Sequence, residues 1–359
     1  MMIKLPKGLE MEELIRSYLL NAGYYVIRGV PYEYQGSDVT DIDLWLYSRA
    51  SVLSREISII DVKNKKTPQA LERIFWVRGL QEAIGADRAL IATTDRRDEV
   101  KSFGKRLDVT VLDGEFLSKL SKSHKDTERR YSEEELVALI NKYEYQKIDG
   151  QWQYRLNKCK SLVIEGLNFS SAIQWLSHAK FFAEQVITKS SHQEISSRCF
   201  YLLCSYIALG VDYMLKECSF LSIEERKRVL TEGFTYGDGG INNLQQTLNI
   251  TSDLIKTYID NSTSINNQIQ HSVYKEIEHL EASSLGDFFS RVDVGKKLFT
   301  VAIELEASAM ARNFKPQLDL TIETRAFLGC LLDYLGINRK EFNAFQANLN
   351  QPIQGDLPI

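Results

Sequence analysis

The sequence predicts a mixed α/β domain in its first third and an all-α domain in the remainder. Residues 40–47 and 56–63 alternate apolar and polar side chains, as half-buried strands do. Amphipathic helical patterns flank this pair of strands on both sides. From residue 132 onward, nearly every apolar side chain recurs at helical spacing.

The first expected element is an amphipathic helix that carries Leu14, Ile15 and Tyr18 on one face. Gly23 is a suitable end for this helix, because glycine readily adopts the left-handed conformation of a C-cap. Residues 24–28 follow as a short strand.

The polar residues 48–55 separate the two alternating strands and are expected to close a hairpin between them. Downstream, Pro68 suits the first turn of a helix, and residues 88–93 are expected to form a short apolar strand. The expected order is therefore helix, strand, strand, strand, helix, strand.

Acidic side chains and one lysine are placed together on the two alternating strands. Asp61 and Lys63 project from one face of the second strand, because side chains alternate with period two. Asp41 and Asp43 share a face of the first strand for the same reason. Carboxylates beside a lysine suit a hard divalent cation and a phosphodiester substrate. The pattern predicts metal-dependent hydrolysis of phosphodiester bonds.

Each of these residues has an expected role. Asp43 and Asp61 would bind Mg²⁺ or Mn²⁺, which lowers the pKa of a bound water and neutralises charge in the transition state. Lys63 would orient the attacking water or stabilise that charge. Glu12, on the first turn of the first helix, would complete the coordination, directly or through a water. Asp41 is expected either to support these ligands or to replace one of them.

These residues and the order of elements resemble the PD-(D/E)xK, or restriction-endonuclease-like, nuclease superfamily, in particular its Mrr-like and Holliday-junction-resolvase-like branches. The resemblance covers about residues 8–120 and rests on three motifs: Met11-Glu12 with Gly23-Tyr24, Asp41-Ile42-Asp43, and Ile60-Asp61-Val62-Lys63. It implies a mixed central sheet flanked by helices, a Mg²⁺-dependent endonuclease activity and a DNA substrate. The proline that names the motif is absent before Asp43.

Relatives often carry a glutamine in the helix after the lysine, and Gln69 and Gln81 are the candidates here. The resemblance implies that such a glutamine contacts the nucleic acid. Restriction or anti-phage defence is the setting that this two-part architecture resembles.

Ordinary structural explanations exist for the single residues. Asp61 and Lys63 are also typical of a solvated strand end, and a glutamate near a helix N-terminus, such as Glu12, is favoured by the helix dipole. Asp41 suits a turn before its strand. The combination favours the nuclease, and two alternatives stay open. One is a catalytically silent nuclease fold that binds nucleic acid or assembles with partners. The other is a sensor whose helical domain gates the nuclease.

Charge restricts where a nucleic acid can bind. The net charge is −4, and the first 125 residues carry 20 Lys/Arg against 18 Asp/Glu. A binding surface must therefore be local, because phosphate affinity depends on clustered cations. The cations expected to contact nucleic acid are Lys65, Lys66, Arg73 and Arg78. A second basic group is either a contact or a solvated helix face: Arg96, Arg97, Lys101, Lys105 and Arg106.

The predicted organisation is a nuclease domain over residues 1–120, a polar linker over 121–131, and a helical domain over 132–359 for recognition, sensing or oligomerisation. The sequence contains no run of about 18 apolar residues, so no membrane span is expected. The five cysteines form no CxxC pair, so reduced thiols of a cytoplasmic protein are expected. A homodimer would provide two active sites for two DNA strands, and a defence-system protein is another possible partner.

The helical domain is predicted to be an irregular bundle. Ser132 and Ser222 begin helices, because a glutamate stands three residues after each and forms a capping box. Residues 198–215 are expected to form a buried central helix. The glycine-dense residues 233–240 are expected to connect two helices, with phosphate binding as the alternative. Further helices are expected at residues 170–188, 242–258, 264–280, 285–311, 321–335 and 339–349.

Overall fold

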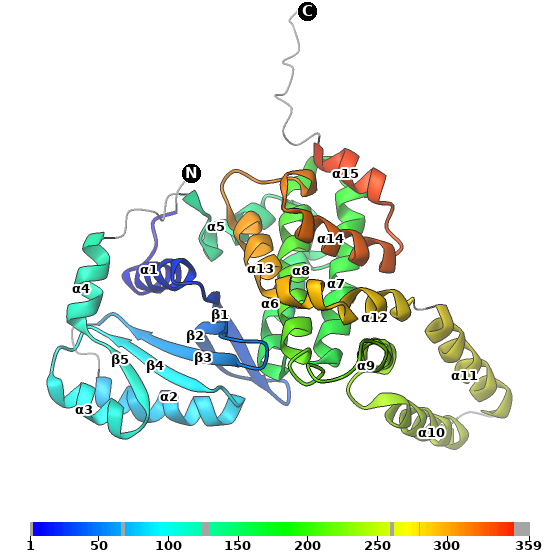
Figure 1. Cartoon of the computed structure of the whole chain (residues 1–359), viewed down its shortest axis with the longest axis horizontal. Helices are drawn as coiled ribbons and strands as arrows, with labels where there is room; N and C mark the ends of the chain where they lie inside the picture. The colour runs from blue at the N-terminus through cyan, green and yellow to red at the C-terminus, as the bar shows by residue number, and fades with distance from the viewer. Residues whose placement is uncertain (1–2, 66–68, 124–128, 259–261, 280, 348–359) are drawn as a thin grey trace, which may run out of the picture.

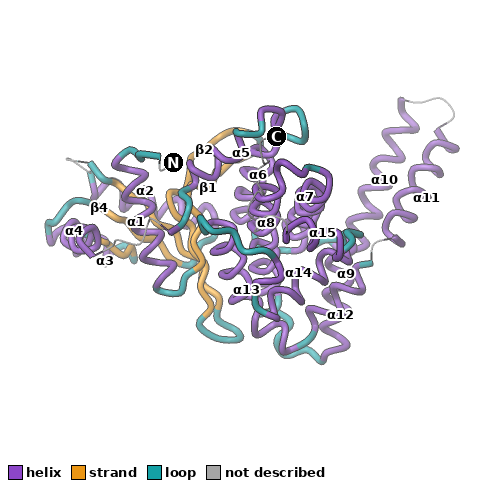
Figure 2. Tube along the Cα trace, turned by 90° about the horizontal axis from the view of Figure 1, so that it is seen from above, coloured by secondary structure: helices purple, strands orange, loops and turns teal. Residues whose placement is uncertain are grey.

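The computed structural model describes residues 3–65, 69–123, 129–258, 262–279 and 281–347. A five-stranded mixed sheet with helices on both faces lies at one end, and a helical region lies beside it (Figures 1 and 2). This confirms the α/β region followed by an all-α region. Within the described ranges, every helix is too short or too polar to cross a lipid bilayer.

The strands lie side by side in their sequence order. The first three pair antiparallel, and the last two add in parallel. The turn between the first two strands contains Gln35 and Gly36, both with positive φ, which suits a tight hairpin. The strands are β1 (Tyr25–Tyr34), β2 (Ser37–Arg49), β3 (Arg55–Lys63), β4 (Arg88–Thr93) and β5 (Val109–Leu112).

Helices cover both faces of the sheet. In Figure 1, α1 (Lys7–Asn21) and α4 (Gly114–Ser123) lie on one face, and α2 (Ala70–Ile84) and α3 (Asp98–Arg106) lie on the other. Successive side chains of β2 point to opposite faces of the sheet, so this strand contributes to the core on both faces. Leu44 and Leu46 belong to the core beneath α1 and α4, whereas Trp45 and Tyr47 belong to the core on the opposite face.

The helical region is built around one buried helix. Of the 22 residues of α8, 20 are buried, as expected for the most apolar segment. Both predicted capping boxes, at Ser132 and Ser222, are present. The helices are α5 (Glu133–Asn141), α6 (Trp152–Glu165), α7 (Phe169–Thr188), α8 (Gln193–Met214), α9 (Ile223–Tyr236), α10 (Gly240–Tyr258), α11 (Ser262–His279), α12 (Ala282–Ser290), α13 (Val292–Met310), α14 (Ile322–Tyr334) and α15 (Arg339–Ala347).

The prediction of one continuous helix over residues 285–311 is wrong. The chain leaves the helical conformation at Arg291, whose ψ is 132°, and divides the segment into α12 and α13. The Ser290 carbonyl accepts a hydrogen bond from Arg226 Nη1 at 3.0 Å instead of continuing the helix. A tertiary contact therefore overrides the local helical pattern.

The glycine-dense loop that was expected to connect two helices also caps a third. The Asp238 carboxylate accepts hydrogen bonds from the backbone amides of Phe169 and Ser170, at 3.1 and 2.8 Å. These amides begin α7, where a negative charge is favoured by the helix dipole. The anion at this helix N-terminus is thus supplied by the protein itself.

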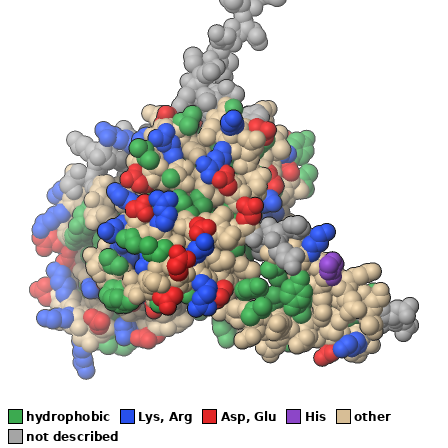
Figure 3. Space-filling view, turned by 45° about the vertical axis from the view of Figure 1, so that its right-hand side comes forward, with side chains coloured by type: hydrophobic (Ala, Val, Ile, Leu, Met, Phe, Trp, Pro, Cys, Tyr) green, Lys and Arg blue, Asp and Glu red, His purple; other side chains and the backbone are tan. Residues whose placement is uncertain are grey.

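The helices α10 and α11 project from the body as a hairpin (Figure 2). On the face drawn in Figure 3, acidic and basic side chains are interspersed over the body, and hydrophobic side chains gather towards the hairpin. The exposed large side chains of these two helices are Ile241, Ile250, Leu254, Tyr258 and Tyr274.

The sheet and the helical region share one continuous hydrophobic core. Tyr25 of β1 and Ser205 of α8 form a hydrogen bond with their hydroxyl oxygens 2.5 Å apart. Of the predicted linker, residues 121–123 belong to α4, 124–128 lie outside the described residues, and Tyr131 donates its amide to the Met310 carbonyl at 2.7 Å. Removing the helical region would therefore uncover part of the sheet face that α2 and α3 also cover.

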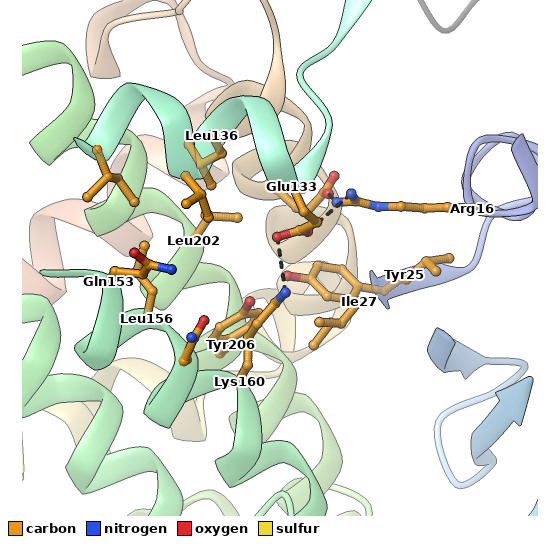
Figure 4. A pocket seen from close by; sticks show the side chains of 15 residues that line it. Arg16, Tyr25, Ile27, Glu133, Leu136, Gln153, Leu156, Lys160, Leu202 and Tyr206 are labelled. Atoms are coloured by element: carbon orange, nitrogen blue, oxygen red, sulfur yellow. Dashed lines mark hydrogen bonds and ion pairs between the residues drawn. The ribbon is translucent and has the colours of Figure 1, made fainter. Parts of the chain in front are cut away.

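Buried ion pairs also join the two regions. Arg16 of α1 lies 3.1 Å from Glu133 of α5 and 2.7 Å from Glu306 of α13. Lys160 of α6 approaches Glu133 from another side, at 3.0 Å, around a cavity of about 30 Å³ (Figure 4). A buried ion pair that loses one partner destabilises a protein strongly, because the remaining charge is left in a poorly solvated place.

Glu133 gives a testable pH dependence. Burial raises the pKa of Glu133, but the charges of Lys160, Arg16 and Arg28 outweigh burial and lower the pKa from 4.5 to about 2. A carboxylate with a lowered pKa in the folded state stabilises the protein above its unfolded pKa, and this contribution is lost as the pH falls from 4.5 towards 2.

We therefore expect Glu133→Gln to lower the free energy of unfolding at pH 7 by about 2–3 kcal/mol. The free energy of unfolding of this variant should also fall less steeply between pH 4.5 and 2 than that of the wild type. Urea unfolding at a series of pH values measures both effects, with the exposed Glu217→Gln as the control. Equal slopes for Glu133→Gln and the wild type would contradict this assignment.

Candidate active site

The middle of β2 and the end of β3 bring the predicted acid–acid–lysine group together. Leu44 pairs with Ile60, so Asp43 stands opposite Asp61 at the next position of the two strands. The Lys63 ammonium lies 3.0 Å from Asp61 Oδ1 and 3.3 Å from Asp43 Oδ2. One cation thus bridges two carboxylates from neighbouring strands.

Asp43 is held by the backbone of the neighbouring strand. Its Oδ2 accepts a hydrogen bond from the Val62 amide at 2.6 Å, and its side chain is 19% exposed. Burial raises the pKa of Asp43, and the nearby Asp61 charge raises it further, while Lys63 and the Val62 amide lower it in part. Burial is therefore the main reason why the ionised form of Asp43 is disfavoured.

Asp61 is nearly fully buried, with a side chain 4% exposed, and an arginine binds it from α2. Arg73 Nε donates to Asp61 Oδ2 at 2.9 Å, and Arg73 Nη2 donates to Asp61 Oδ1. The guanidinium also lies over the Trp76 ring, 4.0 Å from its centroid. Arg73 was predicted to contact nucleic acid, whereas in this structure both carboxylate oxygens of Asp61 receive its hydrogen bonds.

Glu12 of α1 approaches the same group from the other face of the sheet. Burial raises the pKa of Glu12 to about 7, and the charge of Asp43 adds to this effect, whereas Arg28 opposes it. Arg28 Nη1 donates to Glu12 Oε2 at 3.1 Å. Asp41 is exposed on β2 and stands opposite Pro31 of the edge strand β1.

Arg28 is a residue of this region that the sequence analysis missed. It is buried, and besides Glu12 it contacts Glu13 at 2.8 Å and Glu134 at 2.5 Å. Because Glu134 belongs to α5, Arg28 connects the candidate site with the helical region. An arginine within the apolar strand segment 24–30 was the signal that could have identified it.

The expected nucleic-acid contacts are distributed unevenly around the site. Lys65 is exposed directly after β3, Lys66 lies outside the described residues, and Gln69 is exposed at the start of α2. Gln81 is buried two turns beyond Arg73, where its amide donates to the carbonyls of residues 86 and 87. Gln81 therefore stabilises the turn after α2, and the structure does not bring it to the acidic group.

Three further basic side chains are paired with neighbouring groups. Arg78 donates to Gln81 Oε1 at 2.7 Å and contacts Glu82 at 2.8 Å. In the second basic group, Arg97 contacts Asp95 at 2.7 Å, and Lys101 contacts Asp113. Paired cations at a surface contribute less to phosphate binding, since a phosphate must first displace the carboxylate.

Asp43 and Asp61 supply carboxylate oxygens, which are the ligands that Mg²⁺ and Mn²⁺ prefer. In the part of the chain that the structure describes, no group of three or more His, Cys, Asp or Glu side chains is arranged to hold a metal ion. However, Mg²⁺ keeps several waters and is commonly bound through one or two carboxylates. The raised pKa of Asp43, caused by burial and by the neighbouring Asp61 charge, is what a cation would relieve.

Neither a family model, nor a curated protein, nor a solved structure matches this chain. The chemistry of Asp43, Asp61 and Lys63 is therefore the basis for proposing a function.

Proposed function

We propose that the chain is a metal-dependent nuclease that hydrolyses phosphodiester bonds of DNA, with a restriction-endonuclease-like fold in its N-terminal region. The observation that carries this proposal is the Lys63 ammonium, placed between the Asp43 and Asp61 carboxylates of two adjacent strands. Restriction or anti-phage defence is the proposed setting, and a homodimer or a defence partner would supply a second active site.

The side chains have distinct tasks in this proposal. Asp43 and Asp61, with Glu12 directly or through a water, would hold Mg²⁺ or Mn²⁺, which supplies an activated water and neutralises phosphate charge. Lys63 donates hydrogen bonds to the attacking water or to the phosphate oxygen on which charge develops. The pKa of Glu12, raised to about 7 by burial and by Asp43, allows this carboxyl to exchange a proton near neutral pH.

Circular duplex DNA, circular single-stranded DNA and RNA, each with Mg²⁺, Mn²⁺ or EDTA, test this proposal directly. Wild type is expected to open a circle only with metal, and Asp61→Asn is expected to leave it intact while retaining the wild-type circular dichroism spectrum. Cleavage that persists equally in EDTA or in the folded Asp61→Asn variant would contradict the proposal. The substrate that is opened identifies the nucleic acid.

A second candidate function follows from the contact between Arg73 and Asp61. An arginine that binds both oxygens of this carboxylate neutralises it without a metal. The same fold would then bind nucleic acid without cleaving it. The two candidates differ in whether Asp61 exchanges Arg73 for a metal ion.

Arg73→Ala separates these candidates. If Asp61 is a metal ligand, removal of the competing guanidinium is expected to tighten Mn²⁺ binding by about 5- to 30-fold, which corresponds to about 1–2 kcal/mol. Isothermal titration with Mn²⁺ measures this change. Arg78→Ala is the matched control on the same helix, because Arg78 contacts Glu82 instead. Unchanged or weaker Mn²⁺ binding by Arg73→Ala would favour the silent fold.

A further inference from the structure

A second charged region lies at the opposite ends of the two strands that carry the candidate site. The β2–β3 hairpin here meets the helical region around a cavity of about 150 Å³. Arg49 is six residues from Asp43 along β2, which corresponds to about 20 Å of extended chain. The cavity is lined by Arg49, Val52, Arg55, Leu215, Ser219, Arg226, Val292, Gly295 and Lys296.

The lining contains four basic residues and no acidic one. Behind it, the fully buried Asp212 contacts two of them, Arg49 at 2.6 Å and Arg55 at 2.7 Å. One carboxylate thus faces two guanidinium groups. Burial raises the pKa of Asp212, while Tyr47, Arg55 and Arg49 lower it, so positive charge remains in excess even where Asp212 is ionised.

Arg226 adds a charge that its hydrogen bonds do not neutralise. Its guanidinium donates to the carbonyls of Cys218 at 3.2 Å and Ser290 at 3.0 Å, with longer bonds to the carbonyls of residues 219 and 221. Carbonyl oxygens satisfy its donors but carry no net charge. Arg226 and Lys296 line the cavity, and within the described residues neither has a carboxylate partner, so both charges are uncompensated.

The acidic side chains that are close in sequence to the lining have other partners. Glu225, next to Arg226, accepts a hydrogen bond from the Ser222 hydroxyl, and Glu56, next to Arg55, contacts Arg88. Glu217 lies 3.8 Å from Lys216, and Asp293 lies 2.8 Å from Arg291. Lys297, which follows Lys296 directly, contacts Glu323 at 3.5 Å instead of lining the cavity. The two adjacent lysines therefore have different electrostatic surroundings.

We propose that this cavity binds one phosphate group of a small molecule, such as inorganic phosphate or a phosphorylated metabolite. Its volume is that of about five water molecules, which accommodates the five heavy atoms of a phosphate. Guanidinium and ammonium groups are the side chains that recognise phosphate oxygens in proteins. The recess is bounded by Val52, Leu215 and Val292, which suits a compact group more than an extended nucleic-acid backbone.

A bound phosphate would join the hairpin to the helical region. Arg49 and Arg55 belong to the strands that carry Asp43 and Asp61, whereas Arg226 and Lys296 belong to α9 and α13. Because a ligand that binds only the folded state stabilises it, the melting temperature is expected to rise with the logarithm of the phosphate concentration above the dissociation constant. This proposal does not depend on the nuclease proposal.

Lys296→Ala tests the site, with Lys297→Ala as the matched control. Isothermal titration and thermal unfolding are carried out on the full chain with inorganic phosphate, and with chloride at equal ionic strength. Wild type and Lys297→Ala are expected to bind phosphate with the same affinity. The affinity of Lys296→Ala is expected to be at least about fivefold weaker, which corresponds to a loss of about 1 kcal/mol. Lys296 is exposed, so its replacement is expected to preserve folding, unlike that of Arg49, which contacts the buried Asp212.

Two results would overturn the proposal. The first is that the wild-type protein shows no saturable binding of phosphate, or responds to phosphate only as it responds to chloride. The other is equal loss of binding in Lys296→Ala and Lys297→Ala, because it would assign the effect to general surface charge. Competition with a short DNA duplex identifies the source of the group: a duplex that leaves phosphate binding unchanged supports a small-molecule ligand, and one that displaces phosphate overturns that part of the proposal.

Discussion

Replacing Lys63 by alanine is expected to lower the rate of metal-dependent DNA cleavage by about 10²- to 10³-fold, the usual effect of removing one charge-stabilising donor. The ammonium lies within 3.3 Å of both site carboxylates, and its side chain is 25% exposed. Its removal therefore eliminates a cation that contacts both Asp43 and Asp61, while the hydrophobic core stays intact. Single-turnover cleavage of circular DNA at saturating Mg²⁺ measures the effect.

Lys65→Ala is the matched control for this prediction. Lys65 is exposed and lies two residues further along the chain, where it would contact a phosphate only as a point charge. Its replacement is expected to weaken DNA binding and to reduce the salt dependence of binding, with the rate at saturating DNA preserved. A Lys63→Ala protein that cleaves at the wild-type rate, or an equal loss in Lys65→Ala, would contradict the assigned role.

Asp212→Ala is expected to have the largest effect on stability, a loss of about 3–5 kcal/mol in the free energy of unfolding. The Asp212 carboxylate is fully buried, contacts Arg49 and Arg55, and accepts a hydrogen bond from Tyr47 Oη at 2.6 Å. Its removal leaves two arginines and a tyrosine hydroxyl without their shared acceptor in a poorly solvated place. Urea unfolding followed by tryptophan fluorescence measures the loss.

Asp253→Ala on the projecting helix α10 is the control for Asp212→Ala. The Asp253 side chain is exposed and contacts Lys256 at 3.2 Å, so its replacement is expected to change stability by less than about 0.5 kcal/mol. A loss below about 1 kcal/mol in Asp212→Ala would indicate that water reaches this interface and screens the arginines.

The strands that carry the candidate site could be predicted from the sequence, because apolar and polar side chains alternate over residues 40–47 and 56–63, as they do in a sheet with buried faces. The full length of β1 could not be predicted in this way. Gly29 and Pro31 usually interrupt a strand, yet β1 continues to Tyr34. Pro31 is tolerated because β1 lies at the edge of the sheet, where one side needs no backbone donor.

Residue identity within the site was predictable, whereas the pairing of its cations was not. Spacing placed Asp61 and Lys63 on one face, and the sheet places Asp43 beside them. Which arginine approaches Asp61 depends on how α2 is rotated against the sheet, and a single sequence does not encode that rotation locally. For this reason Arg73 was interpreted as a nucleic-acid contact, and the link between Arg28 and Glu12 was missed.

The shared core also has a consequence for synthesis of the chain. The ion pair between Arg16 and Glu306 joins residues 290 positions apart, and the hydrogen bond between Tyr25 and Ser205 spans 180. Ribosomes add about 5–20 residues per second. The strands with Asp43 and Lys63 therefore leave the ribosome well before α8 and α13, which complete the shared core. We expect the complete site to form only late in translation, so that a truncated nascent chain would not yet possess it.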